Sequence, residues 1–304
     1  MQISRKTFIK SAALVTGGVL FGVHKSLAKV LQQADSGFKI MKENFGIYLG
    51  GGGTIFWYIS EDNVIVIDSQ NPASAKSFMD GLKGKTSRSI DILFNTHHHF
   101  DHTSGNIYLK QFAKKIVAQE NCPRLQKEAY GSGDKAKEQV YADTTFAKKW
   151  TYNAGKEKIT ASYIAPAHTG GDSIIHFENT NIVHVGDLVF NNLYPYIDNK
   201  NGGGSIKSWV TVLEKVEKEF SSDITFIFGH ANSDDNATGK MKDIVSMRNY
   251  LQALLDYTSK GIKEGKTLDQ LQKISEIPGV KPRGEKWPKA LAANIDSAYS
   301  ELKK

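Results

Sequence analysis

Short apolar runs rich in β-branched and aromatic residues alternate with turn residues in the first part of the chain. They occupy 38–48, 54–60 and 64–68, and four consecutive glycines at 50–53 separate the first two. Such runs predict antiparallel strands with tight connections. A phosphate-binding loop would continue into a Gly-Lys-Ser/Thr sequence and a helix, and the glycines are not followed by these. We therefore interpret them as a mobile turn that can overhang a site.

From residue 72 onward the pattern changes to helices alternating with strands. Helices are expected at 72–82 and 104–112, and strands at 90–94 and 116–118. This is the βαβα order of an α/β protein. The range 131–150 has no clear hydrophobic period, and we expect it to form either a lid or a long active-site loop.

The second half of the chain returns to strands and ends in helices. Four strands are expected, at 159–164, 173–177, 182–185 and 224–228. The range 205–220 has its apolar residues on one helical stripe and a serine in the N-cap position, so it predicts an amphipathic helix. The C-terminal region is expected to be mainly helical, and we interpret its apolar positions as packing faces.

Residues 1–28 are expected to be an export signal that does not belong to the fold. Basic residues precede an apolar stretch at 11–23 that is too short to span a bilayer, and Ser26-Leu27-Ala28 has the pattern of a cleavage site. The range 4–10 resembles a twin-arginine export motif in which Lys6 replaces the second arginine. We therefore expect one domain over 29–304, exported to the periplasm or secreted, with no membrane span after cleavage.

The positive charge of the chain is largely a property of this leader. The whole sequence carries a formal net charge of +7, and the leader contributes four basic residues and no acidic one, which leaves +3. Arginines in the mature chain are few and scattered, which argues against a nucleic-acid partner. Cys122 is the single cysteine, so no intramolecular disulfide can form, and we interpret it as a small buried apolar residue.

The sequence His97-His98-His99-Phe100-Asp101-His102 directly follows the predicted strand at 90–94. Imidazole and carboxylate are ligands of zinc and related divalent ions. In an extended segment, side chains two residues apart point the same way. His97 and His99 can therefore bind one ion while His98 points away, and Asp101 and His102 can serve a second, adjacent ion.

Further candidate residues stand at the ends of other predicted strands. His168, Asp187 and His230 are of this kind and carry side chains that bind metals. Asp68 also ends a strand. It is either the N-cap of the helix that follows or the partner that orients a ligand histidine.

Taken together, His97-x-His99-x-Asp101-His102 followed by His168, Asp187 and His230 resembles the motif set of the metallo-β-lactamase superfamily. The resemblance implies a fold of the α/β (α+β) class, a four-layer αβ/βα sandwich with two mixed sheets face to face. It also implies how two Zn²⁺ ions are held: the first by His97, His99 and His168, the second by Asp101, His102 and His230, with Asp187 bridging them.

The activity that the resemblance implies is hydrolysis by a hydroxide shared between the two ions. Asp101 is expected to orient the hydroxide and to relay a proton to the leaving group, as the catalytic residue. β-Lactamases of the similar subclass have a cysteine at the position of Asp187 and, three residues later, a lysine that binds the substrate carboxylate. This chain has Phe190 at the position of that lysine. We expect a small ester, lactone, thioester or amide (β-lactam-like) substrate in a pocket lined by aromatic residues, with candidates Trp57, Tyr58, Tyr194, Tyr196 and Trp209.

Two other interpretations are open. A mononuclear iron persulfide dioxygenase would hold one Fe²⁺ with two histidines and one carboxylate, which His97, His168 and Asp187 can supply. The chain could also be a metal-binding protein without turnover. No oligomeric state follows from the sequence.

Overall fold

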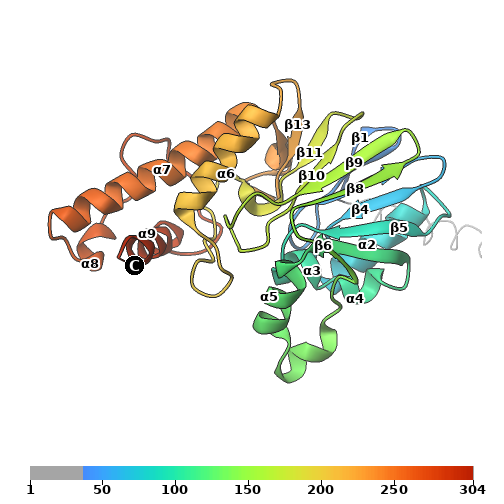
Figure 1. The fold of residues 1–304 in the computed structure, drawn as a ribbon, viewed down its shortest axis with the longest axis horizontal. Helices are drawn as coiled ribbons and strands as arrows, with labels where there is room; N and C mark the ends of the chain where they lie inside the picture. Colours follow the sequence, from blue (N-terminus) through green and yellow to red (C-terminus); the bar gives the residue numbers. More distant parts are fainter. Residues whose placement is uncertain (1–36, 304) are drawn as a thin grey trace, which may run out of the picture.

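The structure is a computed structural model that describes residues 37–303, and its centre consists of two sheets face to face (Figure 1). The first sheet has seven strands in chain order: β1 (Phe38–Lys42), β2 (Phe45–Tyr48), β3 (Ile55–Ile59), β4 (Val64–Ile67), β5 (Ile90–Asn95), β6 (Ala113–Gln119) and β7 (Thr144–Phe146). The second has, in spatial order, β15 (Thr238–Gly239), β13 (Thr225–Ile227), β11 (Ile182–His184), β10 (Ile174–Phe177), β9 (Glu157–Ser162) and β8 (Lys149–Ala154). A separate parallel pair joins β12 (Phe190–Asn191) to β14 (His230–Ala231).

Helices cover the outer faces of both sheets, as Figure 1 shows. The α-helices are α2 (Pro72–Lys83), α3 (Phe100–Thr103), α4 (Asn106–Leu109), α5 (Asn121–Tyr130), α6 (Ile206–Glu219), α7 (Met241–Lys263), α8 (Leu268–Leu271) and α9 (Ala290–Leu302), and the 3₁₀ helices are η1 (Gly133–Glu138), η2 (Gly186–Leu188) and η3 (Asp234–Ala237). Helices α2 and α4 pack on the first sheet, and α6, α7 and α9 pack on the second. Within 37–303, no helix is long and apolar enough to cross a bilayer.

Strand β4 shows why the molecule has four layers. Its residues alternate between two environments because successive side chains of a strand point to opposite faces. Ile65 and Ile67 lie in the core between the sheets, together with Phe177 of the second sheet. Val64 and Val66 belong to the other core, which the first sheet shares with Phe78 of α2. The expected αβ/βα sandwich is therefore present.

Three predicted elements differ in detail from the structure. The strand at 38–48 is a hairpin, because a turn at Glu43 and Asn44 divides it into β1 and β2. The helix predicted at 104–112 is shorter: α4 covers only Asn106–Leu109, and the separate short helix α3 (Phe100–Thr103) precedes it. Gly105 separates the two helices: its N–H donates to Gln70 O (2.6 Å), and a Cβ at this position would lie 2.1 Å from Ser69 O. The range 131–150 contains η1, β7 and the start of β8. The predicted leader, residues 1–28, lies outside the described residues.

Candidate metal centre

The predicted ligands come from loops at one edge of the two sheets. Strands β4 and β5 are parallel, as are β11 and β13, so the carboxyl ends within each pair lie side by side. His97 to His102 follow β5, Asp187 follows β11 and His230 follows β13. His168 lies on the loop from β9 to β10, at the same edge, because β9 is antiparallel to β10 and β10 is antiparallel to β11. The topology thus brings together side chains that are far apart in sequence.

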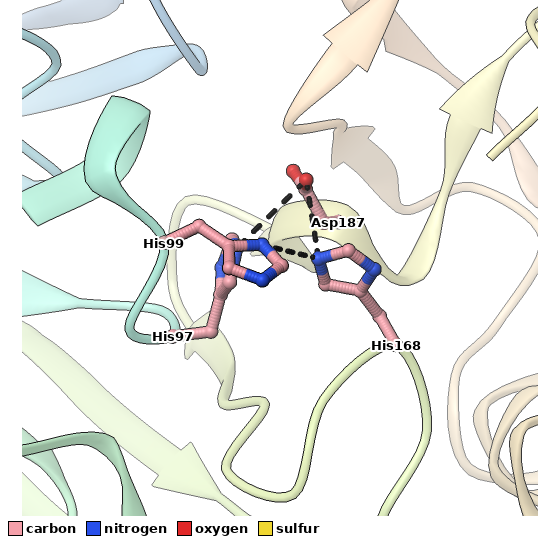
Figure 2. Close-up of side chains that lie close together, drawn as sticks. All are labelled: His97, His99, His168 and Asp187. Carbon is pink, nitrogen blue, oxygen red and sulfur yellow. Dashed lines mark hydrogen bonds and ion pairs between the residues drawn. The ribbon is translucent and has the colours of Figure 1, made fainter. Parts of the chain in front are cut away.

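A first group consists of His97, His99, His168 and Asp187, whose candidate ligand atoms all lie within 4.8 Å of one another. Figure 2 shows the His99 ring, the His168 ring and the Asp187 carboxylate turned toward one another, with the His97 ring behind His99 in this view. His99 Nδ1 is 3.0 Å from both His97 Nε2 and His168 Nε2. Asp187 Oδ2 is 3.5 Å from His168 Nε2 and 3.8 Å from His97 Nε2. This group could hold one metal ion.

A second group consists of Asp101, His102 and His230. His230 Nε2 is 3.0 Å from Asp101 Oδ2 and 3.4 Å from His102 Nε2. Asp187 reaches this group too, with its Oδ1 3.1 Å from His102 Nε2 and its Oδ2 3.4 Å from His230 Nε2. The carboxylate of Asp187 therefore stands between the two groups, the place that a bridging ligand occupies.

The geometry and chemistry of both groups fit zinc. Ligand atoms about 2.0–2.1 Å from a tetrahedral ion lie about 3.3 Å from one another, which is close to the spacings within each group. Asp187 Oδ1 is buried and makes no hydrogen bond of good geometry within the described chain, as expected of an oxygen that needs a cation. Imidazole nitrogens with carboxylate oxygens are a donor set that zinc accepts readily.

Hydrogen bonds behind the rings select which nitrogen of each histidine faces the group. His102 Nδ1 donates to Asp68 Oδ2 (2.7 Å), and His168 Nδ1 donates to the backbone carbonyl of Tyr196 (2.8 Å). Both rings therefore turn Nε2 toward the ligand groups, and this nitrogen can bind a metal once it carries no proton. Asp68 is thus the orienting partner and not a helix cap, because Asn71 accepts from Ser74 N and caps α2.

Asp198 orients the ring of His99, as Asp68 orients that of His102. Asp198 was not identified from the sequence. His99 Nε2 donates to Asp198 Oδ2 at 3.0 Å, which leaves Nδ1 facing the first group. The backbone N–H of Gly202 also donates to Asp198, at 2.9 Å. His98 stays outside both groups, as predicted, and its Nε2 lies 3.8 Å from the same carboxylate. Asp198 sits in a loop without secondary structure, so no periodicity or strand end marks it in the sequence.

Burial and charge shift the pKa values of the site in opposite directions. Burial lowers the pKa of His168 to about 3, and the nearby His99 adds to the effect. Burial would raise the pKa of Asp187, but His230, His102 and His97 outweigh it and hold that pKa well below its usual range. The same balance holds the pKa of Asp101 low, because His102 and His230 outweigh burial. Both carboxylates are consequently ionised at neutral pH.

The two groups lie at the base of a cavity of about 1000 Å³. Of the five aromatic residues predicted to line a pocket, only Tyr196 lines this cavity, and the other four are buried in the cores. Aromatic residues missed from the sequence are Phe100, Tyr130, Phe190 and Trp287. The wall on one side is α5, through Leu125 and Tyr130. No residue of 131–150 lines the cavity, so the structure places no active-site loop there, and the lid stays a prediction.

The glycine run 50–53 lies against the second group. Gly53 donates its N–H to Asp101 O (2.9 Å), and Thr54 N donates to Gly229 O (2.9 Å). A Cβ on Gly53 would lie 2.0 Å from His102 Cε1. The run therefore allows the backbone to approach a ligand histidine closely, a role that the mobile-turn interpretation did not include.

Comparison with known proteins agrees with this fold and site. Residues 49–230 match the metallo-beta-lactamase superfamily, and the chain belongs to that superfamily, which includes metallo-hydrolases. A probable metallo-hydrolase of Methanocaldococcus jannaschii is 29% identical over 139 residues, which cover 41% of this chain and 62% of that protein. The chain thus spans less than two thirds of the length of this relative.

Solved structures show the same fold. A metallo-beta-lactamase from Pontibacter korlensis superimposes with a TM-score of 0.61 at 14% identity, covering 71% of this chain and 98% of its own. A stereoselective inverting sec-alkylsulfatase from Pseudomonas sp. has a TM-score of 0.61 at 14% identity, covering 89% of this chain and 51% of its own. These likenesses bear on the fold alone.

Proposed function

We propose that this protein is a zinc-dependent hydrolase that cleaves an ester, lactone, thioester or amide carbonyl in a small molecule. The observation that carries the proposal is the pair of three-ligand groups that share Asp187 at the base of an open cavity. A mononuclear iron site needs only one such group. The second group, of Asp101, His102 and His230, therefore favours two ions over the dioxygenase alternative.

The two ligand groups would hold two divalent ions, which when bound would make hydroxide available at neutral pH and would stabilise a developing oxyanion. The protein contributes the carboxylate of Asp101, which belongs to the second ligand group. Asp101 lines the cavity, its side chain is 41% exposed, and its Oδ2 lies 3.0 Å from His230 Nε2. Because Asp101 is ionised, it can orient the attacking oxygen and accept its proton.

The proton then passes from Asp101 to the leaving group. The bond from the carbonyl carbon to oxygen, sulfur or nitrogen breaks as the new C–O bond is completed. The products are a carboxylate and an alcohol, thiol or amine. The proton that water loses when hydroxide forms passes to the solvent, or to the amine when the substrate is an amide, so atoms and protons balance with water as the only co-reactant. Neither a serine nor a cysteine nucleophile is required, and Cys122 is unsuited to the role because burial raises its pKa far above the usual value.

A hydrolysis screen with metal analysis tests the proposal. Protein purified without added metal is analysed for zinc and iron, loaded with zinc, and assayed on lactones, thioesters, cephalosporins and a sec-alkyl sulfate. We expect two zinc ions per chain and turnover of at least one carbonyl substrate, with Asp101→Asn at least 100-fold slower. One iron with persulfide oxidation, or two zinc ions without turnover of any substrate, would contradict the proposal.

We further propose that the protein is exported and acts in the periplasm or outside the cell. The proposal rests on the leader-like residues 1–28 of the sequence. Protein recovered from the periplasm or the medium should begin at Lys29. Retention in the cytoplasm with residues 1–28 intact would contradict export while leaving the catalytic proposal untouched.

A further inference from the structure

A segment of the C-terminal region, beyond the superfamily match at 49–230, forms part of the cavity wall. Lys286 and Trp287 both line the cavity. The segment is fixed by Gly284, whose N–H donates to Asn192 O (2.8 Å) and whose carbonyl accepts from Tyr194 N (2.9 Å). These residues belong to the loop that follows Asp187. An isolated β-bridge between Leu193 and Gly284 thus attaches this part of the wall next to the candidate metal centre.

Arg283 strengthens the same attachment. Its guanidinium donates to Phe190 O at 3.3 Å and to Ser246 O at 2.8 Å. It also stacks over the Tyr250 ring, 5.1 Å from the centroid. A guanidinium with several fixed partners holds the chain on either side in place. Lys286 and Trp287, three and four residues further on, are therefore presented to the cavity from an anchored base.

Lys286 lies beside the second ligand group. Its Nζ is 2.7 Å from His230 Nδ1 and 3.5 Å from His230 Nε2. Among residues 37–303 it forms no ion pair. The other basic residue of the cavity wall, Lys200, is already paired with Asp296 at 2.6 Å. The two lysines line the same cavity, but only Lys200 forms an ion pair within residues 37–303.

The carboxylates that line the cavity are already engaged. Asp187 and Asp101 belong to the ligand groups, Asp198 accepts from His99, and Glu128 pairs with Arg124. Lys286 contacts His230 but has no carboxylate partner among residues 37–303, and an anionic group of the substrate can supply one. Beside it, the Trp287 ring meets the Tyr196 ring edge to face, with centroids 6.0 Å apart, and offers an apolar surface.

We propose that Lys286 recognises a carboxylate of the substrate and that Trp287 contacts an adjoining apolar group. The substrate class is then a carbonyl compound that carries a free carboxylate a few bonds from the bond that is cleaved. The spacing supports this, because Lys286 Nζ and Asp101 Oδ2 both lie within 3.5 Å of His230 Nε2. This inference rests on the proposed hydrolase function.

Matched substrates and variants test the inference. The 4-nitrophenyl monoester of glutarate carries a carboxylate, and its methyl ester does not. We expect the zinc-loaded wild type to prefer the charged substrate. Lys286→Met should lose about tenfold in kcat/KM for the charged substrate, mainly through KM, and change little for the neutral one, since a partly exposed charged hydrogen bond is of this strength. Lys286→Arg should retain most of the preference.

Lys200→Met is the control, because it removes a lysine of the same cavity whose charge is already neutralised. Its preference should match the wild type. Zinc content is measured for every variant, because Lys286 also contacts His230. An equal loss on both substrates with reduced zinc would mean a structural role and overturn the inference, as would an unchanged preference in Lys286→Met.

A binding measurement separates this inference from the proposed function. Calorimetric titration of the zinc-loaded protein with glutarate and with dimethyl glutarate needs no turnover. Failure to hydrolyse either nitrophenyl ester would count against the proposed function. Carboxylate recognition would still be supported if the wild type binds glutarate more tightly than dimethyl glutarate and Lys286→Met weakens glutarate binding about tenfold. Equal binding of glutarate by wild type and Lys286→Met would overturn it.

Discussion

The close approach of Gly53 to His102 gives a sharp prediction for Gly53→Ala. A Cβ at this position would lie 2.0 Å from His102 Cε1, 2.4 Å from Nε2 and 2.6 Å from Nδ1, all far inside van der Waals contact. The ring cannot simply move aside, since it is fully buried and donates to Asp68. The backbone of Gly53 is held as well, because its carbonyl accepts from Gln70 Nε2 at 2.6 Å.

The size of the effect follows from these two constraints. Overpacking of a tight site costs about 1–3 kcal/mol. If the ring turns away, the charge-assisted hydrogen bond from His102 to Asp68 is also lost, at about 1.5–3 kcal/mol. We therefore expect Gly53→Ala to lower the free energy of unfolding of chelator-treated protein by about 2–5 kcal/mol. Displacement of His102 should also weaken binding of the second zinc ion by more than about tenfold.

Urea unfolding and competition with a chromophoric zinc chelator measure the two effects. Gly84→Ala is the matched control, because Gly84 ends α2 in an ordinary helical conformation and is exposed, and the nearest atom to its added Cβ is Gly81 O at 3.2 Å. It should change stability by less than about 0.5 kcal/mol. If Gly53→Ala unfolds like the wild type and still binds two zinc ions tightly, the packing argument is wrong and the mobile-turn interpretation returns.

Two further predictions concern buried carboxylates. Asp68 accepts a hydrogen bond from His102, and Asp198 accepts one from His99. Asp68→Asn and Asp198→Asn should therefore each weaken the binding of a different zinc ion by about 10- to 100-fold, measured by chelator competition. If both substitutions weaken the binding of the same ion, the separation into two groups is refuted. Burial raises the pKa of Asp172 to about 7, so its neutral form stabilises the folded chain at low pH and this contribution is lost as the pH rises to about 7. Between pH 5 and pH 8, chelator-treated Asp172→Asn should gain about 3 kcal/mol in unfolding free energy relative to wild type, and a pH-independent difference would show that Asp172 is ionised throughout.

Most of the strands and the seven candidate ligands could be predicted from the sequence for a local reason. Strands were visible as short β-branched runs, and the ligands stand where such runs end. The structure brings these seven side chains together because parallel neighbours place their carboxyl ends at one edge. The sequence could not distinguish the two roles of Asp68, since a cap and an orienting carboxylate both follow a strand.

Residues on long loops were missed because tertiary packing alone decides where they lie. Asp198 comes from an irregular loop, and Lys286 reaches His230 across 56 residues of sequence. The aromatic residues were misjudged for a related reason. Trp57 and Trp209 are both fully buried, and composition gives no sign of which large rings fill a core and which line a cavity. The glycine run was read as flexible because the ring that it packs against is 49 residues away.

The central claim is that seven side chains form two adjacent metal sites that share Asp187. Diffraction from crystals of the zinc-loaded protein, measured on both sides of the zinc absorption edge, tests this claim most directly. We expect two anomalous peaks, one among His97, His99 and His168 and one among Asp101, His102 and His230, with the Asp187 carboxylate between them. A single peak in only one group, or peaks outside both, would contradict the account.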